Sequence, residues 1–203
     1  MIKVIVEGRV IAVQPRIRLL RSFDQRQHNY PGYALLVASD KPPVWIGVGP
    51  AAHAKFGFCA GGSFFAEVEP VANPELEAVD YYKATKIRYT PGASQQDSPP
   101  PWLGVPPDLP TYRVRGHRRL DAGTYESFCR RCMWGCRMPV EMTIDQWNPR
   151  EKRYRKETFC YGPKSCPSYR PGPVREVPGR NATTWTEEDG VDEDATAHRG
   201  PED

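Results

Sequence analysis

The chain lacks the long apolar run that a membrane-spanning helix needs. None of its hydrophobic stretches approaches the roughly 18 residues required to cross a bilayer. Its first residues, MIKVIVE, also lack the basic start and small-residue cleavage site of a signal peptide. Helical periodicity is scarce, and 22 prolines and 17 glycines favour short elements joined by many turns. The sequence therefore predicts a mostly β, cytoplasmic protein with no membrane partner.

Motifs that carry catalysis are missing as well. The sequence contains no GxxxxGK[ST] phosphate loop, no GxSxG nucleophile turn and no HExxH metal motif. Gly47 and Gly49 are followed by Pro50 and lack the third glycine of a dinucleotide fingerprint. The four histidines show no paired spacing either. We therefore expect a protein that is not an enzyme.

Residues 1–89 carry the alternating apolar pattern of β-strands. Runs at 1–13, 33–39, 42–49, 61–71 and 80–89 predict five strands, with a short helix at 50–56 after the third. The basic stretch at 14–32 is predicted to be a long connection, and Gly8 indicates a bulge in the first strand.

Three strands, a helix and two strands form an element order that resembles the OB-fold. That fold is a small five-stranded barrel that binds oligonucleotides or oligosaccharides. The resemblance covers residues 2–89 and rests on element order alone. A different small β-barrel or sandwich is the alternative.

The rest of the chain divides by composition into three further regions. Residues 90–111 carry seven prolines and predict an extended linker. Residues 112–180 form a basic module that contains five of the six cysteines, and residues 111–180 hold 16 Lys and Arg against 7 Asp and Glu. Residues 181–203 hold one Arg against eight acids and predict a disordered tail.

The clustered cysteines predict a metal site. The runs CRRCMWGC at 129–136 and CYGPKSC at 160–166 flank two alternating segments joined by NPRE, so a β-hairpin would bring the two cysteine turns together. In the cytoplasm, clustered cysteines are more often metal ligands than disulfides. A cysteine pair, a hairpin and a second pair resemble a zinc ribbon over residues 125–170. The expected Zn²⁺ ligands are Cys129, Cys132, Cys160 and Cys166.

The spacing leaves alternatives open. The second cysteine pair is more widely separated than in the usual ribbon, and Cys136 is surplus. Cys136 is either an alternate ligand in place of Cys132 or a spare thiol. An Fe–S cluster would use Cys129, Cys132 and Cys136, with Cys160 or Cys166 as the fourth ligand. Disulfides or unliganded thiols are the remaining possibility. A metal held by four sulfurs leaves no coordination position for a substrate, which favours a structural site.

Basic and aromatic residues around the cysteines predict a nucleic-acid partner, with RNA favoured. Basic groups neutralise phosphates, and aromatic faces stack on unpaired bases. The alternative is that these cations offset the thiolate charge or form a solvated hairpin face. The predicted contact residues are Arg16, Arg18, Arg21, Phe23, Arg26, Tyr30, Arg113, Arg115, Arg118, Arg119, Arg130, Arg131, Arg153, Tyr154, Arg155, Lys156 and Lys164.

Three functions from different classes fit this pattern. The first is a non-catalytic protein that binds RNA or single-stranded DNA with a barrel face and a metal-stabilised ribbon. The second is a protein-interaction or assembly subunit of a larger complex with a structural zinc, and the third is a small Fe–S or redox protein. A further hypothesis is that the acidic tail folds back onto the basic module and competes with nucleic acid.

Overall fold

The computed structural model describes residues 3–22, 26–92, 100–188 and 190–203, and it is mostly β, as predicted. Strands account for 43% and helices for 18% of the described residues. No helix within these ranges is both long and apolar enough to cross a bilayer. The elements are β1 (Val4–Arg21), β2 (Arg26–Ala38), β3 (Val44–Val48), α1 (Pro50–Phe56), β4 (Ser63–Pro70), η1 (Pro74–Leu76), β5 (Tyr81–Thr90), α2 (Leu109–Arg115), β6 (Arg118–Arg119), α3 (Ala122–Ser127), η2 (Cys129–Arg131), β7 (Gly135–Thr143), β8 (Lys152–Cys160), β9 (Glu176–Pro178), η3 (Arg180–Ala182), β10 (Thr184–Thr186) and α4 (Val191–Thr196), where η marks a short 3₁₀ helix.

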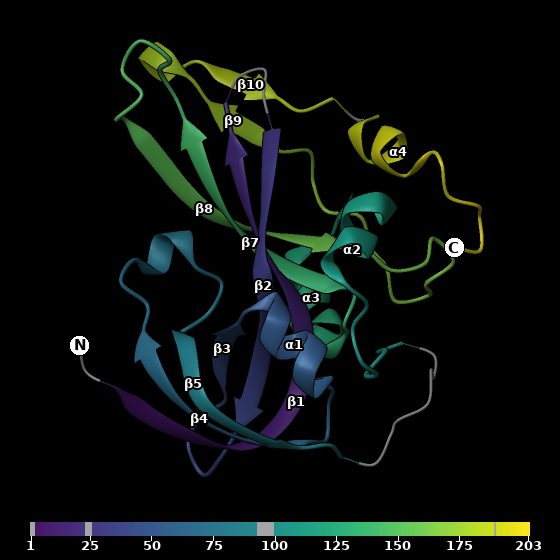
Figure 1. The fold of residues 1–203 in the computed structure, drawn as a ribbon. Helices are drawn as coiled ribbons and strands as arrows, with labels where there is room; N and C mark the ends of the chain where they lie inside the picture. Colours follow the sequence, from purple (N-terminus) through teal and green to yellow (C-terminus); the bar gives the residue numbers. More distant parts are fainter. Residues whose placement is uncertain (1–2, 23–25, 93–99, 189) are drawn as a thin grey trace.

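The pairings of the first five strands lead from β1 back to β1 (Figure 1). Strand β1 pairs with β2 and β4, β4 pairs with β5, β5 pairs with β3, and β3 pairs with β2. Only the β3–β5 contact among these is parallel. Helix α1 lies between β3 and β4, begins at Pro50 and ends where Gly57 adopts a left-handed conformation with φ of 58°. The predicted order of three strands, a helix and two strands is confirmed.

The predicted connection at 14–32 is wrong, because nearly all of it is strand. Strand β1 continues to Arg21 and β2 begins at Arg26, so the two form a long hairpin arm. Ile17 and Leu19 are fully buried on one face of this arm, which continues the period-two pattern of the first strand. Arg16 and Arg18 occupy the alternate positions on either side of Ile17, although their charge suggested a loop.

Gly8 allows β1 and β2 to approach each other closely. A Cβ atom at this position would lie 2.1 Å from the carbonyl oxygen of Ala38, which is inside van der Waals contact. The register between the two strands shifts just beyond this point, between Val10 and Ala12. The irregularity that the glycine indicated is therefore present, displaced by a few residues.

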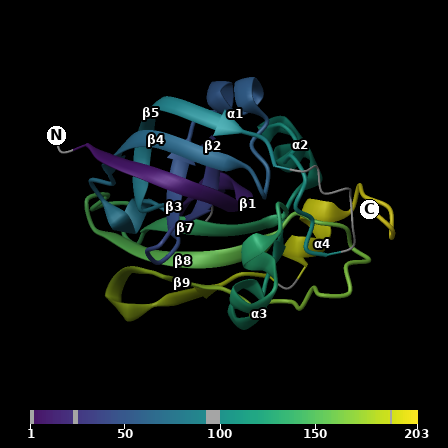
Figure 2. The same ribbon diagram turned by 90° about the horizontal axis from the view of Figure 1, so that it is seen from below.

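The predicted hairpin between the cysteine clusters is confirmed. Strands β7 and β8 pair along their whole length, from Gly135 with Cys160 to Thr143 with Lys152. Strand β7 also pairs in parallel with the end of β1, so the hairpin joins the sheet of the first five strands. Figure 2 shows β7 and β8 next to β1, with β9 beyond β8.

One hydrophobic core extends through both halves of the sheet. The alternate residues Cys136, Met138, Val140 and Met142 of β7 are almost fully buried and belong to the same cluster as Ile17 of β1. Residues on both sides of the Pro-rich segment 90–111 contribute to this core. The division of the chain into separate domains at that segment stays a prediction.

The Pro-rich segment is docked where the structure describes it, from residue 100 onward. The backbone carbonyl of Trp102 accepts a hydrogen bond from Met133 N at 2.9 Å, and that of Leu103 accepts one from Ala60 N at 3.3 Å. Helix α2 then begins at Leu109, with the Asp108 carboxylate accepting from Thr111 N. This segment therefore bridges the first five strands and the cysteine turns.

The acidic tail packs against the basic module, and the predicted disorder is not what the structure shows for its described residues. Strands β9 and β10 pair as a small second sheet, and α4 follows (Figure 1). Thr196 and Arg199 are only 2% and 6% exposed. Arg199 donates to the carbonyl oxygens of Tyr161 and Gly162.

Two partly buried histidines join the hairpin arm to the module and predict an acid-sensitive fold. The rings of His28 and His117 lie 4.7 Å apart. Burial lowers the pKa of His28 to about 4 and that of His117 to about 3, and Arg26 and Arg21 add to both shifts. Because both folded-state pKa values lie below the ordinary 6.5, the neutral rings stabilise the fold above about pH 6.5. That contribution is lost as the pH falls toward 4.

We expect the free energy of unfolding to fall between pH 6.5 and 4.5 by up to about 1.4 kcal/mol per pH unit for each histidine. Urea denaturation of a His28→Asn/His117→Gln variant over this range should give a shallower pH dependence than the native chain. His198→Gln, which alters an exposed tail residue, should keep the native slope. Equal slopes for the double variant and the native chain would contradict the prediction.

Candidate metal centre and basic surface

Four cysteines from two distant turns line one small cavity. Cys129 begins the 3₁₀ turn η2 and Cys132 follows it, whereas Cys160 ends β8 and Cys166 lies in the turn beyond. All four line a cavity of about 30 Å³. The β7–β8 hairpin thus brings together the four residues predicted as ligands. Each of them is a free thiol.

Burial disfavours the thiolate form of three of these cysteines, Cys129, Cys132 and Cys160. Within the described ranges, no group of three or more His, Cys, Asp or Glu side chains forms a ready ligand cluster. Burial raises the pKa of Cys129 and Cys132 to about 12, and the nearby Cys160 thiol adds to the effect for both. Burial also raises the pKa of Cys160, although the Gly162 N–H and the Arg118 guanidinium act against this shift. Thiolates in this cavity would therefore need a compensating cation.

Gln14 of β1 fixes the first cysteine turn. Its side-chain amide is 2% exposed and donates to the carbonyl oxygens of Cys129, Arg130 and Cys132 at 2.9, 3.2 and 2.9 Å. Its own carbonyl oxygen accepts from the Tyr125 hydroxyl at 2.8 Å. A residue from the first strand therefore orients the ligand turn, which the sequence pattern did not reveal.

Cations surround the second cysteine turn. Arg118, which is 9% exposed, donates to Pro163 O at 2.8 Å and to Gly162 O at 3.4 Å. Arg199 lies behind the same turn, and its buried Nε and Nη2 atoms have no hydrogen-bond partner among the described residues. Arg118 Nε is also buried and has no hydrogen-bond partner among the described residues. Such buried donors favour negative charge on the neighbouring sulfurs.

Cys136 lies outside the cavity. It is fully buried in the main core, and its thiol donates to the carbonyl oxygen of Pro15 at 3.5 Å. Burial raises its pKa strongly. The surplus thiol therefore occupies a core position on β7, and Cys132 occupies the cavity.

Many of the arginines predicted to bind nucleic acid form internal ion pairs instead. Arg16 and Arg18 both reach Glu77, which follows η1 and is itself buried. Burial lowers the pKa of both guanidinium groups. Arg16 is only 9% exposed, so in this conformation it is not presented to a phosphate backbone.

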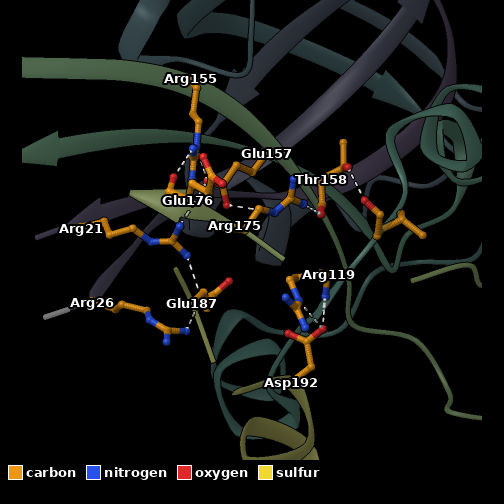
Figure 3. Close-up of polar contacts among 11 residues, drawn as sticks. Arg21, Arg26, Arg119, Arg155, Glu157, Thr158, Arg175, Glu176, Glu187 and Asp192 are labelled. Carbon is orange, nitrogen blue, oxygen red and sulfur yellow. Dashed lines mark hydrogen bonds and ion pairs between the residues drawn. The ribbon is translucent and has the colours of Figure 1, made fainter. Parts of the chain in front are cut away.

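A second set of predicted arginines belongs to a buried charge network (Figure 3). Arg21 contacts Glu157 at 3.4 Å and Glu187 at 2.9 Å, and Arg26 contacts Glu187 at 2.7 Å. Arg155 contacts Glu157 at 2.5 Å. Glu157 is 1% exposed, so this network holds the arm, β8 and the start of the tail together.

The tail occupies further cations of the module. The Asp192 carboxylate accepts from Arg119 N at 2.7 Å and from its Nε at 3.2 Å (Figure 3). Asp203 pairs with Arg115 at 2.6 Å, and Lys164 Nζ donates to the carbonyl oxygen of Arg199 at 3.0 Å. The folding back of the tail onto the basic module is therefore present in the structure.

The remaining predicted contact residues have mixed surroundings. Arg26, Arg113, Arg131, Arg153 and Lys156 are exposed, whereas Arg130, Tyr154 and Tyr30 are partly buried. The Arg113 guanidinium lies over the Tyr30 ring at 5.0 Å. Phe23 lies outside the described residues.

An exposed basic surface lies beside the first cysteine turn, and two of its members were missed by the sequence analysis. Phe128 is 61% exposed although it borders the cysteine cavity. Arg130 and Arg137 both lie near Glu126, at 3.8 and 4.0 Å, and their side chains remain 42% and 45% exposed. Lys156 is near enough to Arg137 for the two charges to interact. We call Phe128, Arg130, Arg131, Arg137 and Lys156 the turn surface.

The missed residues had only a weak signal in the sequence. Arg137 directly follows Cys136, where a cation is equally consistent with compensation of thiolate charge. Phe128 precedes the first cysteine of the 129–136 run and has the hydrophobic character of a core residue.

Comparison with protein families, curated proteins and solved structures finds nothing that matches this chain.

Gln14→Leu should destabilise the fold by about 2–4 kcal/mol, because three carbonyl groups of the first cysteine turn would lose the amide as a donor and the buried Tyr125 hydroxyl would lose its acceptor. Tyr125→Phe removes only the hydroxyl that donates to Gln14 and should cost about 1 kcal/mol. Urea denaturation of the two variants measures this difference. A Gln14→Leu variant no less stable than Tyr125→Phe would show that the amide does not orient the turn.

Proposed function

We propose that this chain is a non-catalytic protein that binds single-stranded nucleic acid, with RNA favoured, and that a structural zinc ion holds its cysteine turns. The observation that supports it most directly is the lining of one small cavity by four cysteines beneath an exposed basic and aromatic surface. In this proposal the zinc ion binds in the cysteine cavity, and the nucleic acid binds on the exposed surface.

The cavity suits a single ion better than a cluster. A volume of about 30 Å³ is close to what one small sphere occupies, whereas an Fe–S cluster contains several iron and sulfide atoms. Cys136, one of the three ligands that the Fe–S alternative would use, lies in the main core. Four cysteines form a common ligand set for structural Zn²⁺. Zinc is therefore the proposed metal.

Thiolates bound to zinc would also satisfy the cations around the second turn. Four thiolates and one Zn²⁺ carry a net charge near −2. Arg118, Lys164 and Arg199 surround the turn between Cys160 and Cys166, with buried guanidinium donors among them. Neutral thiols do not balance the positive charge of these three side chains, whereas the zinc–thiolate dianion would.

The finer architecture is part of the same proposal. The pairing order of β1 to β5, with a helix between β3 and β4, matches the connectivity of an OB-fold. We interpret residues 2–89 as an OB-like barrel and the β7–β8 hairpin with its cysteine turns as a ribbon-like module. Barrels of this type bind oligonucleotides, which agrees with the proposed ligand.

The turn surface is the proposed contact with the nucleic-acid backbone. Its guanidinium and ammonium groups are exposed, unlike Arg16 and Arg21 on the hairpin arm. Phe128 offers an aromatic face beside them, so charge neutralisation and base stacking are available together. Arg115 and Arg119 are already paired with the acidic tail and are left out of this contact.

Purified protein should contain about one zinc ion per chain, as measured by inductively coupled plasma mass spectrometry. Cys132→Ser and Cys160→Ser should each remove most of that zinc and lower the free energy of unfolding by several kcal/mol, because metal binding contributes directly to folding of such modules.

The matched control is Cys59→Ser, which alters a cysteine next to Tyr89 and outside the cavity. It should retain the zinc. Absence of stoichiometric zinc from the native protein, or full zinc content in Cys132→Ser, would contradict the metal site. Stoichiometric iron with visible absorption would favour the Fe–S alternative instead.

Arg130→Gln/Arg137→Gln should weaken RNA binding and make it less dependent on salt. Each phosphate contact to a single strand contributes about −0.7 to the slope of log K against log salt concentration. Removal of two cations should therefore reduce that slope by about 1.4, as measured by fluorescence anisotropy with a labelled mixed-sequence RNA.

Lys41→Gln/Lys55→Gln removes the same charge from exposed residues of the β2–β3 turn and α1. This variant should keep the native slope. Equal losses in both double variants would indicate a general charge effect and count against the turn surface. No RNA binding by the native protein would refute the proposed function and favour an assembly subunit.

A further inference from the structure

A second cavity lies at the end of the β7–β8 hairpin that is opposite the cysteines. It is open to solvent and is bordered by the turn between these strands and by the β9–β10 hairpin, which are near the upper end of Figure 1. Its volume is about 490 Å³, and Asp145, Trp147, Arg180 and Trp185 are among the lining residues. An adjoining cavity of about 480 Å³ shares Asp145 and Arg180 and adds Arg153.

Two indole side chains border this cavity near the protein surface. Trp147 is 83% exposed and Trp185 is 44% exposed. Among the described residues, the clusters that form the hydrophobic core include neither side chain. Single exposed apolar residues are common, but two exposed indoles at one cavity form the kind of grouped apolar surface that marks a binding site.

The turn that presents Trp147 is held by local hydrogen bonds. The Asp145 carboxylate accepts from Trp147 N at 2.9 Å, and Asp145 O accepts from Asn148 N at 3.1 Å. The indole is therefore attached to an ordered turn, which lowers the entropic cost of binding a ligand.

Polar groups of both signs face the same space. The Asp145 side chain is 13% exposed and forms an ion pair with Arg180 at 3.5 Å. A carboxylate beside a guanidinium offers both an acceptor and donors to the edge of a heterocycle. Arg153 and Arg180 are exposed, so they can also contact phosphates on either side of a bound base.

We propose that this cavity binds one unpaired base of a single-stranded nucleic acid, with the base stacked on Trp147. Aromatic side chains stack on bases of any identity. The exposed arginines are positively charged and would attract the negative phosphates of the adjoining backbone. This inference rests on the proposed function, since it adds a base site to the same ligand. In that arrangement the strand would run along the β7–β8 hairpin from the turn surface to the two tryptophans.

The test compares Trp147→Ala with Trp147→Phe in fluorescence anisotropy with a labelled mixed-sequence RNA. Trp147→Ala should raise Kd about tenfold or more, because one stacked base is lost. Trp147→Phe should recover most of the affinity. Since the side chain is largely exposed, neither substitution should alter the thermal unfolding transition.

An abasic oligonucleotide of the same length and charge separates stacking from electrostatics. Native protein and Trp147→Ala should bind this probe with equal affinity. Native-like RNA affinity in Trp147→Ala, or an equal loss on the abasic probe, would overturn the base site while leaving RNA binding by the turn surface intact. Failure of the native protein to bind RNA would instead overturn the proposed function and the base site with it.

Discussion

The pairing of β1 with three other strands is the constraint on which the rest of the structure depends. Its first third pairs with β4, most of its length pairs with β2, and its last residues pair with β7. The same strand carries Gln14, whose amide binds three carbonyl groups of the first cysteine turn. The position of the cysteine cavity is therefore set by the central sheet as well as by the hairpin that carries the cysteines.

Besides the strand pairing of β1, the buried charge network also joins distant parts of the chain. Arg21, Glu157 and Glu187 come from β1, β8 and the tail, and all three side chains are at most 5% exposed (Figure 3). Removing such charges from water is expensive, so removal of one partner would cost more than the pair contributes. The network consequently favours one alignment of the tail on the module over others.

The basic residues fall into two groups, those that form internal ion pairs and those that are exposed at the surface. Arginines on the hairpin arm and beneath the tail are paired with Glu77, Glu187, Asp192 and Asp203. Exposed cations remain at both ends of the β7–β8 hairpin, each end with an exposed aromatic residue, Phe128 or Trp147. The net charge of the module therefore overstates the surface that a polyanion can reach.

The local features of this protein follow from short stretches of its sequence. Alternation of apolar residues gave the strand order of the first 89 residues and the β7–β8 hairpin, and Pro50 and Gly57 marked the ends of α1. These features depend on near neighbours, because backbone preferences and the burial of one strand face act within a few residues. The two cysteine turns were likewise predicted to meet, since a hairpin places its two ends together.

Which charges are exposed, and which thiol lies in the core, depends on contacts between distant segments. Arg16 and Arg21 carry the same signal in the sequence as Arg131 and Lys156, yet Glu77 and Glu157 neutralise the first two from 61 and 136 residues away. Cys136 differs from Cys132 because it falls on the buried face of β7. Long-range pairing and burial depend on where distant segments meet, and a local pattern of residues does not contain that information.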